Sequence, residues 1–360
     1  MPRILSVSSY QPPYKIEQEE TARLTKKLFQ DDFKEIERLL KVFQNGEIKT
    51  RHFCVPMNWF EKPHSFEERN QLYIELATKY GVEAIQACLK NNLYLEEEVS
   101  SGDIDAIIFV SSSGISTPSL DARIMNKLSF SDSMKRIPIW GLGCAGGASG
   151  VSRAFDYCLA HPSAKVLLLC VELCSLTFQH DDRSKSNLIG ASLFADGAAC
   201  ALICGDNVEI KTKKAVPLIK ATASKWMPDS EDVMGWEVKN NGLHVVFSKD
   251  IPAIISSWLG PFVEDFLGQH NMAPEDVKHF VAHPGGKKVL KAYEKTLRYS
   301  EEKMHHSREV LTHNGNMSSP TVLYVLERFM ESEDCRQGDA GLLTALGPGF
   351  SGELVLLKWT

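Results

Sequence analysis

Cys144 lies in the most chemically suggestive stretch of the sequence, the glycine-rich segment 140–150. The segment follows an apolar, strand-like run and precedes a helical pattern, which predicts a strand-to-helix turn. A helix N-terminus favours an anion, because it presents free N–H groups and the positive end of the helix dipole. This placement predicts a thiol of lowered pKa that acts as a nucleophile. The alternative, a small buried cysteine, fits Cys158, Cys170 and Cys200 better.

The same stretch contains a literal G-x-G-x-x-G, formed by Gly141, Gly143 and Gly146. A dinucleotide site of this kind needs an acidic residue about 20 positions further on, at the end of the next strand. Glu172 is the candidate for that role, and it lies well beyond this spacing. The stretch therefore favours a nucleophile over a dinucleotide site.

Two polar residues at other predicted turns can assist a thiolate. His283 ends an apolar run before a helical pattern, which mirrors the position of Cys144. Asn316 lies in a polar turn, and its amide N–H groups can bind an oxyanion. Either residue alone is typical of a structural role, but the three at turns before helices predict one shared site. Three other histidines lie in polar surroundings and are expected to be exposed, namely His305, His306 and His313.

Metal binding is the weaker alternative. Cys170 and Cys174 have a separation close to that of zinc ligands, as do Cys200 and Cys204. Each pair lies within or beside a predicted apolar strand, so buried core thiols are the simpler explanation. The acidic pair at 181–182 lies in a polar loop and is expected to be solvated. We expect no metal.

Alternating strand and helix patterns must position these residues, and such alternation predicts a mostly parallel, buried sheet. Apolar spacing also predicts an early helix with Phe33, Ile36, Leu39 and Leu40 on one face. The predicted strands are 104–110, 137–142, 165–171, 198–204 and 277–282, with two more flanking 347–349. The other predicted helices are 72–93, 151–161, 251–267, 287–297 and 319–330.

A faint internal repeat indicates a duplication. In the first copy, a strand follows a helix, the segment 91–93 and Asp103. In the second copy, a strand follows a helix, the segment 270–272 and Asp276. Both strands end in a small polar or glycine-containing turn. Chance similarity between two helix–strand units remains open as an alternative.

The composition is that of an ordinary globular protein, with 43% hydrophobic and 24% charged residues among 360. The net charge of -6 argues against a nucleic-acid partner, which favours a basic protein. No signal-peptide pattern is visible, and no apolar run approaches the roughly 18 residues of a membrane span. An odd count of nine cysteines indicates reduced thiols, so we expect a cytoplasmic protein.

Five short motifs together resemble the type III polyketide synthases, the chalcone and stilbene synthase superfamily. The resemblance runs in one order from about Phe33 to the C-terminus. The segment 138–147 and the pair Gly235–Trp236 are similar to the bacterial branch of the family. Within that branch the chain is similar to alkylpyrone synthases. It implies a thiolase fold, a duplicated αβαβα five-layer sandwich in an α/β homodimer. One half, 1–206, would carry the cysteine, and the other, 207–360, the histidine and asparagine. The motifs are GCAGG (143–147), FADGA (194–198), HPGG (283–286), GNMSS (315–319) and GPG (347–349).

The resemblance also implies roles for single residues. Cys144, His283 and Asn316 would form a catalytic triad, and Phe194 matches the family's gating phenylalanine. Val245 takes the place of a second family phenylalanine, which leaves the cavity shape open. Further positions match family residues that line the cavity, namely Thr177, Gly285 and Ser318.

Two more roles follow from the resemblance. Thr117 matches a residue in a loop, 111–118, that reaches into the cavity of the partner subunit. Arg38 and Lys41 align approximately with basic residues that bind the phosphates of coenzyme A. A solvated helical face explains these two cations equally well.

The implied activity joins an acyl-CoA starter to malonyl-CoA by decarboxylative condensation and needs no metal or redox cofactor. The small residues at 145–148 leave room beside the thiol, so a medium-to-long fatty acyl starter and an alkylpyrone product are expected. Three alternatives stay open. They are a β-ketoacyl synthase III-like enzyme with one condensation per cycle, an inactive acyl-CoA-binding protein, and a cysteine hydrolase.

Overall fold

The computed structural model describes residues 1–30, 35–248 and 250–360. Its main feature is a nine-stranded sheet with the order β11-β12-β13-β8-β1-β7-β6-β4-β5. The strands are β1 (Arg3–Tyr10), β4 (Ala106–Val110), β5 (Lys135–Ile139), β6 (Lys165–Leu173), β7 (Asp196–Cys204), β8 (Pro217–Trp226), β11 (His279–Ala282), β12 (Ala340–Gly347) and β13 (Ser351–Trp359).

The predicted parallel sheet is mostly wrong. Parallel pairing is confined to β4 with β5, β4 with β6, and β11 with β12, and the other neighbouring pairs are antiparallel. The long apolar runs of β6 and β7 arise because both faces of these strands are buried. Helices cover both faces of such a sheet whether its strands run parallel or antiparallel, so burial alone did not reveal the direction.

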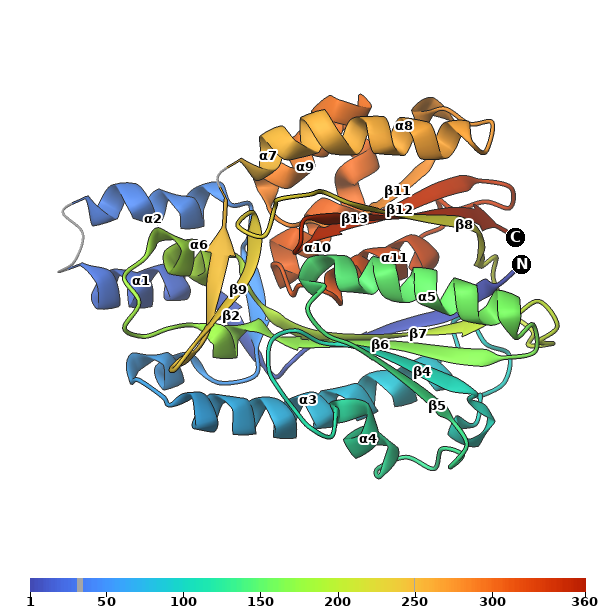
Figure 1. The fold of residues 1–360 in the computed structure, drawn as a ribbon, viewed down its shortest axis with the longest axis horizontal. Helices are drawn as coiled ribbons and strands as arrows, with labels where there is room; N and C mark the ends of the chain where they lie inside the picture. Colours follow the sequence, from blue (N-terminus) through green and yellow to red (C-terminus); the bar gives the residue numbers. More distant parts are fainter. Residues whose placement is uncertain (31–34, 249) are drawn as a thin grey trace.

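The sheet divides into two stacked layers. β1 and β8 pair only at Arg3 and Leu218, and beyond that point the two parts of the sheet lie one above the other (Figure 1). The helices α5 (Gly146–Ala160) and α11 (Thr321–Glu331) fill the space between them. The outer helices are α3 (Phe66–Leu89) and α4 (Leu120–Met125) on one side, with α7 (Ile251–Ile254), α8 (Gly260–Gly268) and α9 (Lys287–Leu297) on the other.

This arrangement is the five-layer αβαβα sandwich expected from the resemblance. The predicted repeat has a structural counterpart, because a short 3₁₀ turn precedes β4 at Ser101–Asp103 and another precedes β11 at Pro274–Asp276. The predicted helix 251–267 is interrupted, because a π-helical turn at Ile255–Leu259 separates α7 from α8.

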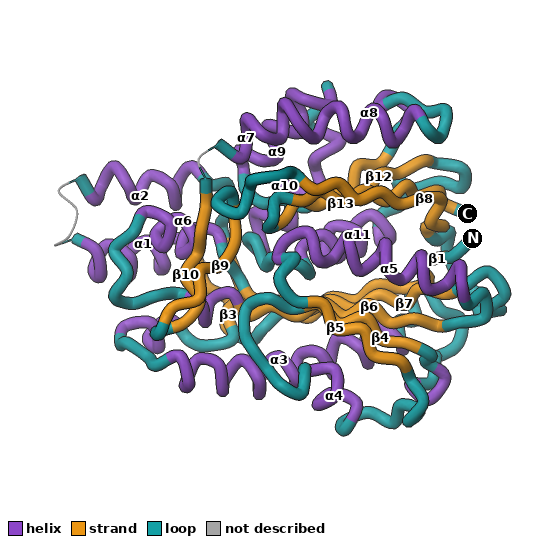
Figure 2. Tube along the Cα trace, in the orientation of Figure 1, coloured by secondary structure: helices purple, strands orange, loops and turns teal. Residues whose placement is uncertain are grey.

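A smaller group of elements caps one end of the sandwich (Figure 2). Its helices pack through a separate apolar cluster that contains Phe43 and Leu188. The helix predicted from Phe33 onward begins at Ile36, and Phe33 lies outside the described residues. The elements are β2 (Tyr14–Glu17), α1 (Gln18–Phe29), α2 (Ile36–Asn45), β3 (Thr50–Phe53), α6 (Lys185–Leu193), β9 (Met234–Lys239) and β10 (Gly242–Phe247). Among the residues described, no helix combines the length and the apolar character that crossing a membrane requires.

Candidate active site

Cys144 lies where the sequence predicts it, in a 3₁₀ turn at Gly143–Ala145 that runs directly into α5. The C-terminal glycine motif packs onto this turn, since a Cβ on Gly347 would lie 2.6 Å from the Cβ of Ala145. Seven of the nine cysteines are buried, and only Cys144 and Cys335 are partly exposed. Cys144 is thus an accessible thiol at a helix N-terminus.

His283 follows β11, and its backbone N–H donates to the carbonyl of Thr344 at 2.9 Å. The side chain is buried, and neither ring nitrogen has a hydrogen-bond partner among the described residues. Burial lowers the pKa of the imidazole to about 3, because a charged ring would lose its hydration. At neutral pH the ring is therefore uncharged, with one nitrogen free to accept a proton.

Asn316 connects the nucleophile with the histidine turn. Its Oδ1 and Nδ2 lie 3.9 and 4.0 Å from the Sγ of Cys144. The amide Nδ2 donates to the carbonyl of Gly285 at 3.2 Å, two residues beyond His283. The backbone N–H of Ser318 donates to Oδ1 at 2.8 Å and fixes the orientation of the amide. The structure thus brings the three predicted turns together at one place.

The expected lowering of the thiol pKa is wrong. Burial raises the pKa of Cys144 to about 11, and hydrogen bonds from Ser318 and Asn316 offset this only in part. The carboxylate of Glu172 raises it further, because two negative charges in one apolar region repel each other. The helix N-terminus does not compensate for the loss of water. The thiol therefore needs a base before it can act as a nucleophile.

Glu172 is a site residue that sequence reasoning missed. It is fully buried at the end of β6, where its carboxylate accepts hydrogen bonds from the backbone N–H groups of Ser112 and Ser113. The hydroxyl of Ser319, at the start of α11, donates to it at 2.9 Å. Burial raises its pKa to about 7. The available signal for a buried acidic group was a glutamate that directly follows an apolar run in the sequence.

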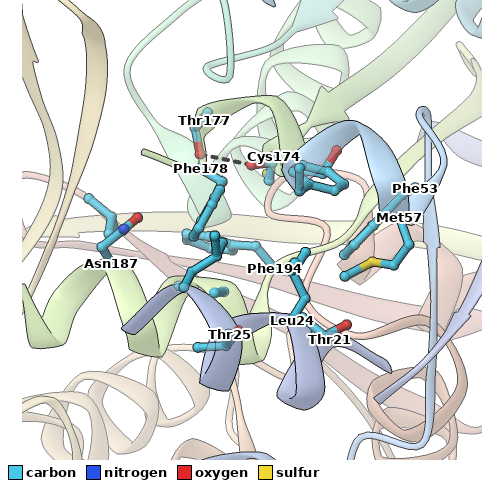
Figure 3. Close-up of a pocket in the computed structure, with 16 residues that line it drawn as sticks. Thr21, Leu24, Thr25, Phe53, Met57, Cys174, Thr177, Phe178, Asn187 and Phe194 are labelled. Atoms are coloured by element: carbon cyan, nitrogen blue, oxygen red, sulfur yellow. Dashed lines mark hydrogen bonds between the residues drawn. The ribbon is translucent and has the colours of Figure 1, made fainter. Parts of the chain in front are cut away.

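An apolar pocket lies beside Phe194, at the capped end of the sandwich (Figure 3). Its free volume is about 50 Å³, and its walls come from α1, α6, β10 and the segments around Phe53 and Thr177. Thr177 donates its hydroxyl to the carbonyl of Cys174 at 2.8 Å. Two of the predicted site residues, Phe194 and Thr177, line this pocket, and so does Val245.

The β9–β10 hairpin closes the pocket over Phe194. The rings of Trp236 and Phe247 lie 5.6 and 5.5 Å from the Phe194 ring, measured between centroids. The hairpin is itself attached to α3, since Arg69 donates hydrogen bonds to the carbonyl of Asn241 and to the side chain of Gln179. Phe194 is therefore packed between the pocket and an aromatic cover.

The remaining predicted residues divide into two groups. Ser318 and Gly285 contact the amide of Asn316 and contribute no wall to the apolar pocket. Thr117, Arg38 and Lys41 are exposed, and none of them contacts the triad within this chain. Arg38 instead donates to the carboxylate of Glu35 at 3.1 Å, on the surface of the end cap.

Zinc binding by the cysteine pairs has no counterpart in the described part of the chain. There, potential ligand atoms of three residues come within 4.8 Å of one another at His305, His306 and Glu309. These lie at the start of α10 (His305–Asn314), with His305 and Glu309 one turn apart, and no cysteine belongs to the group. His305 and His313 are exposed as predicted, and His306 is only partly exposed.

Comparison with known proteins agrees with this geometry. The family of chalcone and stilbene synthases matches residues 3–207 with its N-terminal domain and 218–360 with its C-terminal domain. A putative chalcone synthase of Bacillus subtilis is 48% identical over 99% of this chain and 98% of its own. An alpha-pyrone synthesis polyketide synthase-like protein of Mycobacterium tuberculosis, Pks18, is 28% identical over 89% of this chain and 82% of its own.

The solved structures give the same result. The crystal structure of 1,3,6,8-tetrahydroxynaphthalene synthase from Streptomyces coelicolor, a bacterial type III polyketide synthase, superposes with a TM-score of 0.92. It is 30% identical in sequence, and the match covers 99% of each chain. The architecture is thus the thiolase fold of these enzymes. The chain belongs to the chalcone and stilbene synthase family and is a type III polyketide synthase.

Proposed function

We propose that this polyketide synthase loads a medium-to-long fatty acyl-CoA on Cys144 and extends it with malonyl-CoA to alkylpyrones. The observation that carries the reaction is the contact of a partly exposed thiol with the amide of Asn316, which is hydrogen-bonded to the turn that follows an uncharged His283. This set provides a nucleophile, a base and oxyanion donors, which thioester chemistry requires.

Loading begins with transfer of the thiol proton of Cys144 to the free ring nitrogen of His283. The thiolate attacks the thioester carbonyl, an acyl-cysteine forms, and the thiolate of coenzyme A leaves. The imidazolium then returns the proton to the departing sulfur. The reaction exchanges one thioester for another and consumes no oxidant, metal or further cofactor.

Extension uses the same groups as donors. Malonyl-CoA binds with its thioester oxygen toward His283 and Asn316, whose N–H groups stabilise the enolate that loss of CO₂ leaves behind. The apolar ring of Phe194 disfavours the departing carboxylate. The enolate carbon attacks the acyl-cysteine, and the extended chain returns to Cys144 for two or three rounds before it cyclises.

The apolar pocket supports a fatty starter. Leu24, Phe53 and Val245 line it, and none of the described residues in its walls carries a charge. Each methylene group buried there would contribute about 0.8 kcal/mol. The present free volume of about 50 Å³ is too small for a long chain, so we infer that Phe194 and its aromatic cover move when the chain enters.

Coenzyme A and the partner subunit would complete the site. We assign Arg38 and Lys41, exposed on α2, to the phosphates of coenzyme A. We also propose a homodimer, in which the exposed Thr117 reaches the cavity of the partner subunit. The exposed side chains of Ile115 and Trp140 support a dimer interface here. They are large apolar groups, 43% and 54% exposed, near the edge strand β5. The free thiols suit a reducing cytoplasm.

Product analysis tests the proposal. The purified protein is incubated with malonyl-CoA and a panel of acyl-CoAs from short to long chains, with aromatic starters included, and products are identified by mass spectrometry. Alkylpyrones from the longer fatty starters are expected. Preference for an aromatic starter would overturn the fatty-starter proposal and leave the enzyme class unchanged.

A further inference from the structure

Arg51 is a charged residue in an apolar place. It lies in β3, is 0% exposed, and its guanidinium stacks 5.2 Å from the ring centroid of Phe53. A buried arginine is costly unless its charge and its N–H groups are compensated. The contacts of Arg51 therefore indicate which structural role offsets the free-energy cost of its burial.

The hydrogen bonds of Arg51 end on the segment that carries the gating phenylalanine. Its Nη1 donates to the carbonyl of Phe194 at 2.6 Å and to that of Ala191 at 2.8 Å. These carbonyls end α6, where the helix leaves acceptors unpaired and where its dipole favours a cation. Arg51 thus fixes the backbone from which the Phe194 side chain projects into the pocket.

The same segment is bonded to the backbone of the catalytic asparagine. Asn316 donates its N–H to the carbonyl of Leu193 and accepts from the N–H of Ala195, both at 2.9 Å. Phe194 and Asn316 thereby form an isolated parallel bridge that joins the two halves of the chain. A displacement of α6 by loss of Arg51 would be transmitted directly to Asn316.

Arg51 also contacts the other side of this bridge. The backbone of Gly315 lies against its side chain, and a Cβ on Gly315 would come within 2.8 Å of both Cγ and Cδ of Arg51. Gly315 has a φ of +69°, a left-handed conformation that glycine adopts without strain. One arginine side chain therefore packs against both segments that flank the Phe194–Asn316 bridge.

The charge of Arg51 is compensated from one direction. The carboxylate of Asp196, in β7 of the main sheet, favours the charged guanidinium, although burial lowers the pKa of Arg51 to about 9. Asp196 is itself held by the backbone N–H groups of Cys54 and Ser175 at 2.7 Å. At neutral pH the cation persists. Its Nε and Nη2 find no hydrogen-bond partner in the part of the chain that the structure describes.

We propose that Arg51 is a positioning residue that aligns Phe194 and Asn316 for the decarboxylation of malonyl-CoA. The proposal rests on the function assigned above. The hydrogen bonds of Arg51 go to the segment around Phe194 and not to Cys144 or His283, which perform the loading step. Its loss should therefore slow decarboxylation and leave acylation of the cysteine nearly intact.

The experiment measures the two half-reactions separately in purified full-length variants. Loading is followed as the mass increase of the intact protein with a fatty acyl-CoA, and decarboxylation as the release of labelled CO₂ from malonyl-CoA. For Arg51→Met we expect kcat for decarboxylation to fall about 10²-fold, as for a catalytic group displaced by about 1 Å. Arg51→Lys keeps the charge but not the fork of donors, and should recover part of the rate.

A second variant tests the alignment without removing the charge. Gly315→Ala places a methyl group against Arg51 and strains the turn before Asn316, so it should show the same selective loss. Arg3→Lys is the matched control, because Arg3 also donates to a backbone carbonyl, that of Val208 at 2.8 Å, but at the strand end where β1 meets β8. It should leave both half-reactions unchanged.

The outcomes separate this inference from the proposed function. Parallel losses of loading and decarboxylation in folded Arg51 and Gly315 variants, or unchanged decarboxylation, would overturn the positioning role. Failure of the native protein to acylate Cys144 or to decarboxylate malonyl-CoA would instead overturn the proposed function. Thermal unfolding monitored by circular dichroism identifies variants that have lost their fold.

Discussion

The sharpest test of the acyl pocket is Val245→Phe. Val245 lines the pocket, and its Cγ1 lies close to α6, where a Cβ on Gly190 would be 3.3 Å away. With so little free space behind it, the larger ring must project into the pocket. It would displace roughly four methylene groups of a bound chain, the difference in carbon content between the two side chains.

The magnitude follows from the burial of those groups. At about 0.8 kcal/mol per methylene, four of them contribute about 3 kcal/mol, or roughly 200-fold in kcat/KM. The native enzyme should gain about fourfold in kcat/KM per methylene until the pocket is filled. The variant should reach its plateau at a shorter chain and should process short starters at nearly the native rate.

The assay compares kcat/KM across a series of acyl-CoAs of increasing length, with malonyl-CoA held in excess. Val238→Phe is the control, since Val238 lies on the same hairpin but is 59% exposed and outside the pocket. Identical chain-length profiles for the native enzyme and Val245→Phe would refute the assignment of this pocket to the acyl chain. A flat profile in the native enzyme would refute the fatty starter as well.

Four further predictions concern the site and its assembly. Peptide mapping after incubation with an acyl-CoA should place the acyl group on Cys144, and an adduct on any other cysteine would contradict the assignment. His283→Ala or Asn316→Ala should slow decarboxylation of malonyl-CoA roughly 10²-fold or more, as for loss of an oxyanion donor, and near-normal rates in both would remove them from the mechanism. Burial raises the pKa of Glu172 from 4.5 to about 7, so between these pH values the native state binds a proton that the unfolded state has released, and the protein loses about 3 kcal/mol of stability as pH rises from 4.5 to 7. Denaturant unfolding of Glu172→Gln should not show this loss. An unchanged pH dependence of stability in the variant would contradict the prediction. Light scattering at micromolar concentration should give a homodimer with Thr117 at the interface, and a monomer would argue against the shared cavity.

The sequence was sufficient to place Cys144, His283 and Asn316 at turns that the structure brings together, because each residue obeys a local rule. Cys144 and His283 follow apolar strands, Asn316 precedes a helix, and the turns between such elements gather at one edge of a layered sheet. The family motifs contain the same residues. Because the motifs agree with the local patterns, the site prediction did not depend on the predicted strand directions, which were largely wrong.

Features that depend on long-range contacts escaped prediction. Nothing near Arg51 in the sequence indicates that α6 and the Asn316 turn will pack against it, since its partners lie about 140 residues or more away. The β9–β10 hairpin was missed because β9 has no buried residue and β10 is buried only in its first half, so neither has the apolar run that identifies a buried strand. Glu172 was seen but assigned no role, because its hydrogen-bond donors come from two other elements.

The pKa shifts of Cys144 and His283 have one physical cause, and it too is a property of the folded site. Both groups lose water, so burial raises the pKa of the thiol to about 11 and lowers that of the imidazole to about 3. The neutral pair is therefore the stable resting form, since an ion pair would place charge where it is poorly solvated. In the proposed mechanism a bound thioester changes this balance, because attack on its carbonyl moves the negative charge off the sulfur as the proton passes to His283. Formation of the nucleophile is then tied to substrate binding.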